Sequence, residues 1–343
     1  MQRTHWNLQT FLLLMFLLIS IYSCDPKKVD PAPTPQTLIK GADISWITEM
    51  EAAGKKFYTA AGIEKDPVLL MKELGLNAIR LRVWVNPVDG WNGIQDVIQK
   101  AIRIRQAGLQ LLLDFHYSDT WADPGKQYPP ANWSALNVTT MADSVRAHTT
   151  RVLSALVARG VTPTWVQIGN ETNDGLLWPL GKASQQMTNY ATFFKAGYEA
   201  VKQVDNSIKV MVHISNGYDN NLFRWNLDGL RQYGARWDLI GLSLYPSATD
   251  WMTRVQQCKS NMDDLVVRYQ TPVMVCEVGM PWDQPDACYS FIKELQTQLL
   301  AIPSQQGLGF FYWEPQCYGN WKGYSLGAFD NNGRPTRAMT AFQ

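Results

Sequence analysis

The sequence lacks a surplus of charge of either sign. Its 31 lysines and arginines balance 30 aspartates and glutamates, so it has no basic footprint of the kind that binds nucleic acid. It also lacks zinc-site spacings, because its five cysteines form no C-x-x-C pair and no histidine pair lies near them. No glycine-rich phosphate loop follows the first predicted strand, as a dinucleotide-binding fold would need. We therefore expect neither a nucleic-acid partner nor a metal site.

The N-terminal apolar run is too short to cross a bilayer. Residues 11–19 are apolar throughout, but a membrane-spanning helix needs roughly 20 residues. Arg3 before this run and the small Ser23 after it predict a signal peptide over residues 1–23. Cys24 follows directly, which predicts cleavage and lipidation of the lipoprotein type; an ordinary signal cleaved nearby is the alternative. We expect an exported outer-membrane lipoprotein, on the cell surface or the periplasmic face.

The next segment, residues 24–37, is rich in proline and almost free of bulky apolar side chains. This composition predicts an extended tether. The tether leaves residues 38–343 for a single catalytic domain, a length that suits one large barrel.

Short apolar runs alternate with helical segments along that domain. Runs such as QLLLDF and KVMVHI are apolar at consecutive positions, as in strands buried on both faces. Helical segments before the second, third and fourth runs end on Gly75, Gly108 and Gly160, which fit helix C-caps. The pattern predicts an α/β fold, a single-domain (β/α)8 TIM barrel, with an open doubly wound sheet as the alternative. The expected strands are 39–45, 78–85, 110–117, 164–171, 209–215, 239–246, 272–279 and 307–315.

Polar and aromatic residues collect at the carboxyl ends of these strands, where barrel enzymes carry their active sites. Glu171 and Glu277 end the fourth and seventh strands, and two such carboxylates are what glycoside hydrolysis requires. We expect Arg82 to hold one carboxylate ionised, while burial and the neighbouring charge keep the other protonated. Further candidate substrate-binding residues at strand ends are Asp43, His116, Asn170, His213, Asn216, Tyr245 and Trp313.

Side chains alternate along a strand, which separates neighbours in sequence. Trp313 should therefore face the site, and Glu314 should turn away into a structural hydrogen bond. By the same rule Cys276, next to Glu277, should point outward to the helices. A metal site from Asp114, His116, Asp119 and Asp123 is conceivable, but these side chains alternate and then enter a loop, so convergence on one ion is not implied.

Five blocks of sequence together resemble glycoside hydrolase family 53 of clan GH-A: GADISWITEMEAAGKKFY, NAIRLRVWVNP, LLLDFHYSDTWADPGKQYPPANW, VQIGNETNDGLLWP and GFFYWEP. The resemblance runs from about Gly41 to the C-terminus. It implies a monomeric, retaining endo-β-1,4-galactanase acting on galactan of the type I arabinogalactan in pectin. Two alternatives stay open: a mannanase or cellulase of the same clan, and a non-catalytic surface glycan-binding lipoprotein, which should have lost one glutamate.

The resemblance also implies roles at matching positions. Glu171 would be the acid/base and Glu277 the nucleophile. Asn170 would bind the sugar 2-hydroxyl, Tyr245 would hydrogen-bond Glu277, and Trp313 would lie beneath the sugar at the cleaved bond.

The resemblance also has implications for residues in the loops. Trp121 and Trp321 would be stacking platforms along the cleft. Bacterial members often hold calcium in an Asp-Gly-Asp-type loop after strand seven, but MPWDQPDACYSF lacks that run, so we expect no cofactor. Cys288 and Cys317 follow strands seven and eight, and we hypothesise that a disulfide between them fastens the two loops; two free buried thiols are the alternative.

Overall fold

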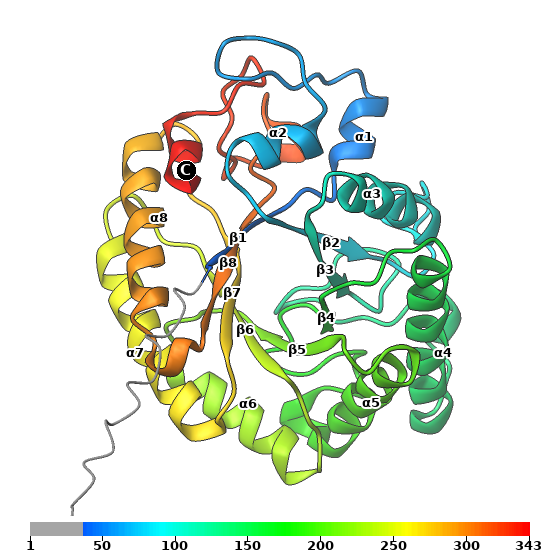
Figure 1. The fold of residues 1–343 in the computed structure, drawn as a ribbon. Coiled ribbons are helices and arrows are strands. Elements are labelled where there is room, and N and C mark those ends of the chain that lie inside the picture. The colour runs from blue at the N-terminus through cyan, green and yellow to red at the C-terminus, as the bar shows by residue number, and fades with distance from the viewer. Residues whose placement is uncertain (1–36) are drawn as a thin grey trace, which may run out of the picture. The chain divides into compact units, whose positions relative to one another are not determined.

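Eight parallel strands close into a barrel in the computed structural model, which describes residues 37–343. Each strand pairs with the next, and β8 pairs back onto β1 (Figure 1). The closure confirms the (β/α)8 TIM barrel and excludes the open doubly wound sheet. The strands are β1 (Ile39–Asp43), β2 (Ala78–Val83), β3 (Gln110–Phe115), β4 (Trp165–Ile168), β5 (Lys209–Ile214), β6 (Leu239–Leu244), β7 (Val273–Val278) and β8 (Gly307–Trp313).

Helices surround the barrel and connect its strands (Figure 1). Three of them end before glycines of positive φ, at Gly75 (95°), Gly108 (72°) and Gly160 (73°), which confirms the predicted C-caps. None of the helices within residues 37–343 is long and apolar enough to cross a membrane. The helices are α1 (Ile47–Ala52), α2 (Pro67–Glu73), α3 (Ile94–Gln106), α4 (Val138–Val157), α5 (Ala183–Val204), α6 (Asn220–Gln232), α7 (Trp251–Tyr269) and α8 (Pro285–Leu300).

The predicted signal peptide, the predicted lipidation site Cys24 and nearly all of the predicted tether lie outside the described residues. The barrel domain begins with β1, close to the predicted boundary.

An apolar cluster fills the barrel interior, separate from the larger core beneath the helices. The interior cluster consists of Ala78, Leu112, Trp165, Met211, Leu239, Met274, Cys276 and Phe311. Two residues further along their strands, the inward side chains become polar: Arg80 follows Ala78, Asp114 follows Leu112, and Gln167 follows Trp165. The apolar cluster is thus the floor on which a buried polar layer rests.

Strand β7 contains an irregularity that determines where Glu277 points. Leu242 of β6 pairs with Val275, and the next residue, Ser243, pairs with Glu277, so Cys276 is an extra residue on β7. Because a bulge interrupts the alternation of side chains, Cys276 joins the interior cluster and Glu277 lines the pocket above it. The expectation that Cys276 points outward is therefore wrong, since it assumed an unbroken strand.

The strands end earlier than the apolar runs do. Tyr117, Glu171, Asn216 and Glu314 all follow a strand and have positive φ, between 45° and 54°. Non-glycine residues seldom adopt this conformation, and it clusters at functional sites. At the top of the barrel the chain therefore turns sharply, and two of these residues, Glu171 and Asn216, line the pocket there.

Candidate active site

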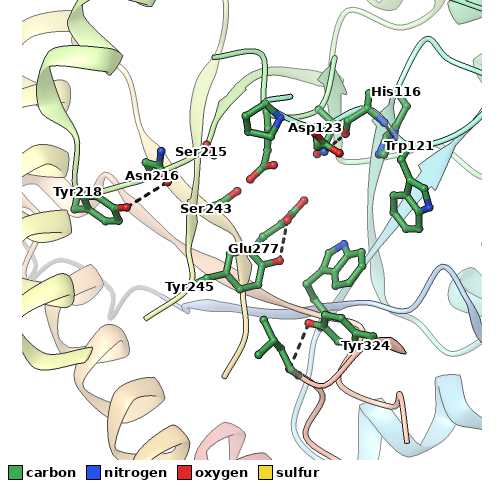
Figure 2. Close-up of a pocket in the computed structure, with 16 residues that line it drawn as sticks. His116, Trp121, Asp123, Ser215, Asn216, Tyr218, Ser243, Tyr245, Glu277 and Tyr324 are labelled. Atoms are coloured by element: carbon green, nitrogen blue, oxygen red, sulfur yellow. Dashed lines mark hydrogen bonds between the residues drawn. The ribbon is translucent and has the colours of Figure 1, made fainter. Parts of the chain in front are cut away.

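A pocket of about 470 Å³ opens at the carboxyl ends of the strands (Figure 2). Both candidate glutamates line it, together with six of the predicted substrate-binding residues. Its walls are His116, Trp121, Ala122, Asp123, Pro124, Asn170, Glu171, Ser215, Asn216, Tyr218, Ser243, Tyr245, Glu277, Trp313, Tyr324 and Leu326.

Glu277 is held by two donors. Arg80 Nη2 lies 2.8 Å from Oε1, and the Tyr245 hydroxyl donates to Oε2 over 2.8 Å (Figure 2). The bond from Tyr245 is the one expected from the sequence. The arginine is not, because the predicted partner Arg82 instead donates to Glu314 over 2.5 Å.

The surroundings of the two glutamates give them different proton affinities. Burial, and then the negative charge of Glu277, raise the pKa of Glu171 to about 8. Burial also raises the pKa of Glu277, but the Arg80 cation and the Tyr245 hydroxyl oppose that rise. Both opposing groups touch Glu277. When the pair shares one proton, that proton therefore resides on Glu171, so the site holds an acid beside an anion.

Arg80 also orders the layer below the glutamates. It is fully buried and lies 2.7 Å from Asp43 and 2.9 Å from Asp114. Its Nη2 also donates to Asn170 Oδ1 over 2.9 Å, while Asn170 Nδ2 donates to the Ala122 carbonyl over 2.8 Å. Asn170 is thereby fixed at the pocket wall, where the same Arg80 nitrogen also contacts Glu277.

Three residues expected to touch substrate are buried beneath the pocket. Asp43 and Arg82 are fully buried and do not line it. His213 is also buried, with Nδ1 accepting from the Glu171 amide at 3.2 Å and Nε2 beside Ser243 Oγ at 2.8 Å. Their inward direction follows from strand alternation, but the polar layer extends deeper than the strand ends suggested. They position the pocket residues rather than forming its surface.

His116 reaches the pocket wall with both ring nitrogens already bonded. Nδ1 accepts from the Ala122 amide at 3.1 Å and from Trp84 Nε1 at 3.2 Å. Nε2 lies 2.9 Å from Asp114 Oδ2, so the proton is on Nε2. The ring therefore presents its carbon edge to the pocket and keeps the Trp121 loop against the barrel.

Tryptophans form the aromatic side of the pocket around Arg82. The Arg82 guanidinium carbon lies 4.5 Å from the Trp121 ring centre, 4.9 Å from Trp46 and 5.8 Å from Trp313. Trp121 and Trp313 line the pocket, whereas Trp321 does not. Glu314 is fully buried and accepts from Arg82 and from the Trp46 amide. Trp313 thus lines the pocket and Glu314 is buried in hydrogen bonds, as expected from the sequence.

The acidic residues of β3 and of the loop after it do not converge on one point. Asp114 is bonded to Arg80 and His116, while Asp119 accepts from the backbone amides of Asn86 and Ala131, both at 2.9 Å. Within residues 37–343 no group of three or more histidine, cysteine, aspartate or glutamate side chains could hold a metal ion.

The predicted disulfide is absent: Cys288 and Cys317 are both buried free thiols. The loops they were expected to fasten are joined by Tyr312 of β8. Its hydroxyl accepts from the Met280 amide at 3.3 Å, after β7, and donates to the Leu326 carbonyl at 3.1 Å, after β8. Cys288 Sγ packs 3.6 Å from the same hydroxyl. A hydrogen-bonded phenol therefore occupies the place that the hypothesis gave to the disulfide.

Sequence reasoning missed Arg80, which is buried beneath the pocket, and several residues of the pocket wall. Arg80 carried a usable signal, because it lies two residues before Arg82 and must face the same way. Asp123, Ser215, Tyr218 and Tyr324 lie beyond strand ends, in loops whose paths the apolar pattern does not determine.

Comparison with known proteins is consistent with this geometry. Residues 39–342 match the family model described as glycosyl hydrolase family 53. A probable arabinogalactan endo-β-1,4-galactanase A of Neosartorya fischeri is 33% identical over 301 residues, covering 80% of this chain and 83% of that protein.

Two solved structures share the whole barrel. One, from a study of two fungal β-1,4-galactanases, superposes with a TM-score of 0.83 at 30% identity and covers 89% of this chain and 99% of the other. The second, a family 53 catalytic domain of Ignisphaera aggregans, has a TM-score of 0.82 at 29% identity and covers 92% and 97%. The chain belongs to glycosyl hydrolase family 53.

Proposed function

We propose that this chain is a retaining endo-β-1,4-galactanase that hydrolyses β-1,4-galactan, with Glu277 as nucleophile and Glu171 as acid/base. The observation that carries the mechanism is the asymmetry of the pair. Arg80 and Tyr245 both contact Glu277, whereas burial beside that charge raises the pKa of Glu171 to about 8. The substrate is inferred from the galactanase names of its relatives.

In the first step Glu277 attacks the anomeric carbon while Glu171 gives its proton to the leaving oxygen. The glycosidic bond breaks, and a glycosyl ester forms on Glu277. Its carboxylate charge is then gone, which removes one cause of the raised pKa of Glu171. Glu171, now a carboxylate, is suited to act as a base.

In the second step Glu171 takes a proton from water as that water attacks the anomeric carbon. The ester bond to Glu277 breaks, and Arg80 and Tyr245 again stabilise the released carboxylate. Two inversions at one carbon retain its configuration. Asn170, fixed by Arg80 and the Ala122 carbonyl, is placed to bind the sugar 2-hydroxyl.

The test is product analysis on β-1,4-galactan, β-1,4-mannan and β-1,4-glucan. Galactan should be cut within the chain to oligosaccharides that first appear as β-anomers by NMR. Cleavage of mannan or glucan instead would reject the substrate, and initial α-anomers would reject the retaining mechanism.

We also propose that the protein is an exported monomer anchored by lipid on Cys24. Support comes from the sequence alone: the apolar run 11–19, Ser23, and the proline-rich residues 24–37. The variant Cys24→Ala should move the enzyme from the membrane fraction to the soluble fraction. Hydrolysis of galactan by intact cells would place the anchor on the cell surface, and light scattering of the purified domain would give its mass.

We further propose that no cofactor is required. The segment MPWDQPDACYSF lacks the Asp-Gly-Asp run, and the buried Tyr312 hydroxyl joins the two loops that calcium would join. Activity and melting temperature should be unchanged by EDTA, and a loss that calcium restores would contradict this.

A further inference from the structure

The pocket has aromatic side chains at two separate ends. Trp121, Trp313 and Tyr324 form one group, with ring centres 5.8 Å apart for Trp121–Trp313 and 4.7 Å apart for Trp313–Tyr324. Tyr218 lines the same pocket from the loop after β5. Figure 2 shows Tyr218 on the opposite side of Glu277 from Trp121. A polysaccharide crossing the pocket therefore meets aromatic rings both before and after the glutamates.

The proposed function assigns a direction to this path. The resemblance implies that the sugar attacked by Glu277 lies over Trp313, which lines the same pocket, so the tryptophan end would hold the part of the chain that becomes the covalent intermediate. Glu171 protonates the oxygen of the other part. Glu171 follows β4, and the next strand, β5, leads into the loop with Asn216 and Tyr218. The leaving part of the chain therefore passes along the β5 loop.

We propose, on the basis of that function, that Tyr218 is the stacking platform for the leaving-group galactose units of the substrate. Sugar rings have flat apolar faces of C–H groups that pack on aromatic rings. Tyr218 is partly exposed and open to the pocket, as a platform must be. No tryptophan lines the pocket at this end within the described residues, so the tyrosine is its principal apolar surface.

Two contacts hold the Tyr218 ring in position. The Arg254 guanidinium carbon lies over it, 4.1 Å from the ring centre, at a distance typical of cation–π attraction. Arg254 is itself fixed by Asp250, with Nε 3.2 Å from the carboxylate. The Tyr218 hydroxyl donates to Asn216 Oδ1 over 3.4 Å (Figure 2). The platform is thus ordered before substrate arrives, which lowers the entropic cost of binding.

Asn216 adds a polar contact beside the ring. Its backbone has a φ of 54°, a conformation that asparagine tolerates better than most residues. Its Oδ1 accepts from Tyr218, while Nδ2 has no protein partner among residues 37–343. That amide can donate to a hydroxyl of a sugar stacked on Tyr218. A flat apolar face next to a free donor suits a neutral sugar.

The experiment compares two substrates that differ in the group that follows the cleaved bond. β-1,4-Galactan places sugars on the proposed platform, whereas β-galactobiosyl fluoride releases fluoride and places none there. Tyr218→Ala should lower kcat/KM on galactan by about tenfold, the effect of losing one large apolar contact. Its kcat/KM on the fluoride should stay at the wild-type value. Tyr218→Phe keeps the ring and should retain most galactan activity.

Tyr128 provides the matched control. It is an exposed tyrosine on the loop after β3 and does not line the pocket, so Tyr128→Ala should behave as the wild type on both substrates. Equal losses by Tyr218→Ala on both substrates, or no loss on either, would overturn the proposal. If the wild type itself leaves galactan intact, the proposed function fails and the galactan platform falls with it, a result that is recognised before any variant is made.

Discussion

Arg80 Nη2 lies 2.8 Å from Oε1 of Glu277, and the arginine side chain has no exposed surface. The same guanidinium contacts Asp43 and Asp114, at 2.7 Å and 2.9 Å. This buried cation therefore contacts three carboxylates. One of them is Glu277, the proposed nucleophile, whereas Glu171, the proposed acid, is not among them. The difference between the two glutamates is built into strand β2, on which Arg80 lies, rather than into either glutamate's own neighbours in sequence.

The proton on Glu171 sets the alkaline limit of activity. Because its pKa is about 8, Glu171 is protonated below that pH and can act as an acid, and it loses this ability as pH rises further. We expect kcat/KM on galactan to fall through about pH 8, since this ratio reports the free enzyme. A profile that stays flat through this region, or that falls already near pH 5, would contradict the assignment.

Removal of the Glu171 carboxyl group should slow the first step of the reaction mainly for substrates whose leaving group needs a proton. Glu171→Ala should lower kcat on galactan by roughly 10²–10⁴-fold, the range for general acid–base catalysis. The loss should be much smaller in the first step with β-galactobiosyl fluoride, whose leaving group departs unprotonated. Added azide should accelerate the variant and give a β-galactosyl azide by NMR; an α-azide would show that the covalent step is wrongly assigned.

The Tyr245 bond should be visible in the acidic part of the pH profile. Its hydroxyl stabilises the Glu277 carboxylate, so Tyr245→Phe should raise the pKa of Glu277 and shift the rising limb of kcat/KM to higher pH. Because the variant loses a hydrogen bond to a charged group, its kcat/KM should decrease by roughly tenfold or more. Tyr128→Phe, an exposed tyrosine away from both carboxylates, is the control and should leave the limb in place.

The buried Arg82–Glu314 pair should be important for stability. Arg82→Met removes the cation among the tryptophans and leaves Glu314 buried without it, which should cost about 3–5 kcal/mol in the free energy of unfolding. Adding Glu314→Gln removes the unpaired charge and should restore part of this loss. Urea unfolding of the three proteins would measure both effects; a double variant no more stable than Arg82→Met would reject the pairing as the cause.

The Tyr312 hydroxyl, rather than a disulfide, should hold the loops after β7 and β8. Intact mass of residues 38–343 should be identical with and without reductant, since Cys288 and Cys317 are free. Tyr312→Phe should destabilise the domain by about 1–3 kcal/mol, because a buried amide and buried carbonyls lose their partner. A mass two protons lower without reductant, together with a neutral Tyr312→Phe, would restore the disulfide hypothesis.

Strand positions could be predicted because most of the buried strands are apolar at several consecutive positions, and both glutamates lie where such runs stop. Alternation then placed Trp313 toward the pocket and Glu314 away from it. These inferences depend only on the geometry of one regular strand.

Other features depend on contacts between strands, which one strand's pattern does not contain. Arg80 and Arg82 face the same way, and only their neighbours decide which one meets Glu277 and which one meets Glu314. Asp43 and His213 were expected at the surface, but the depth of the polar layer is set by the register of the strands around them. Tyr218 lies in a loop whose sequence has no periodic pattern of apolar residues from which its position could be predicted.

The extra residue in β7 makes the position of the nucleophile a matter of chain length as well as of side-chain type. If β7 kept Cys276 in the barrel interior but lacked the bulge, regular alternation would turn Glu277 toward α7 and α8 while every strand kept its partners. Such a protein could remain a barrel and still have no reaction to perform. In this enzyme one additional residue in β7 therefore separates a folded, inactive barrel from an active one. Libraries that vary the length of β7 would test this directly.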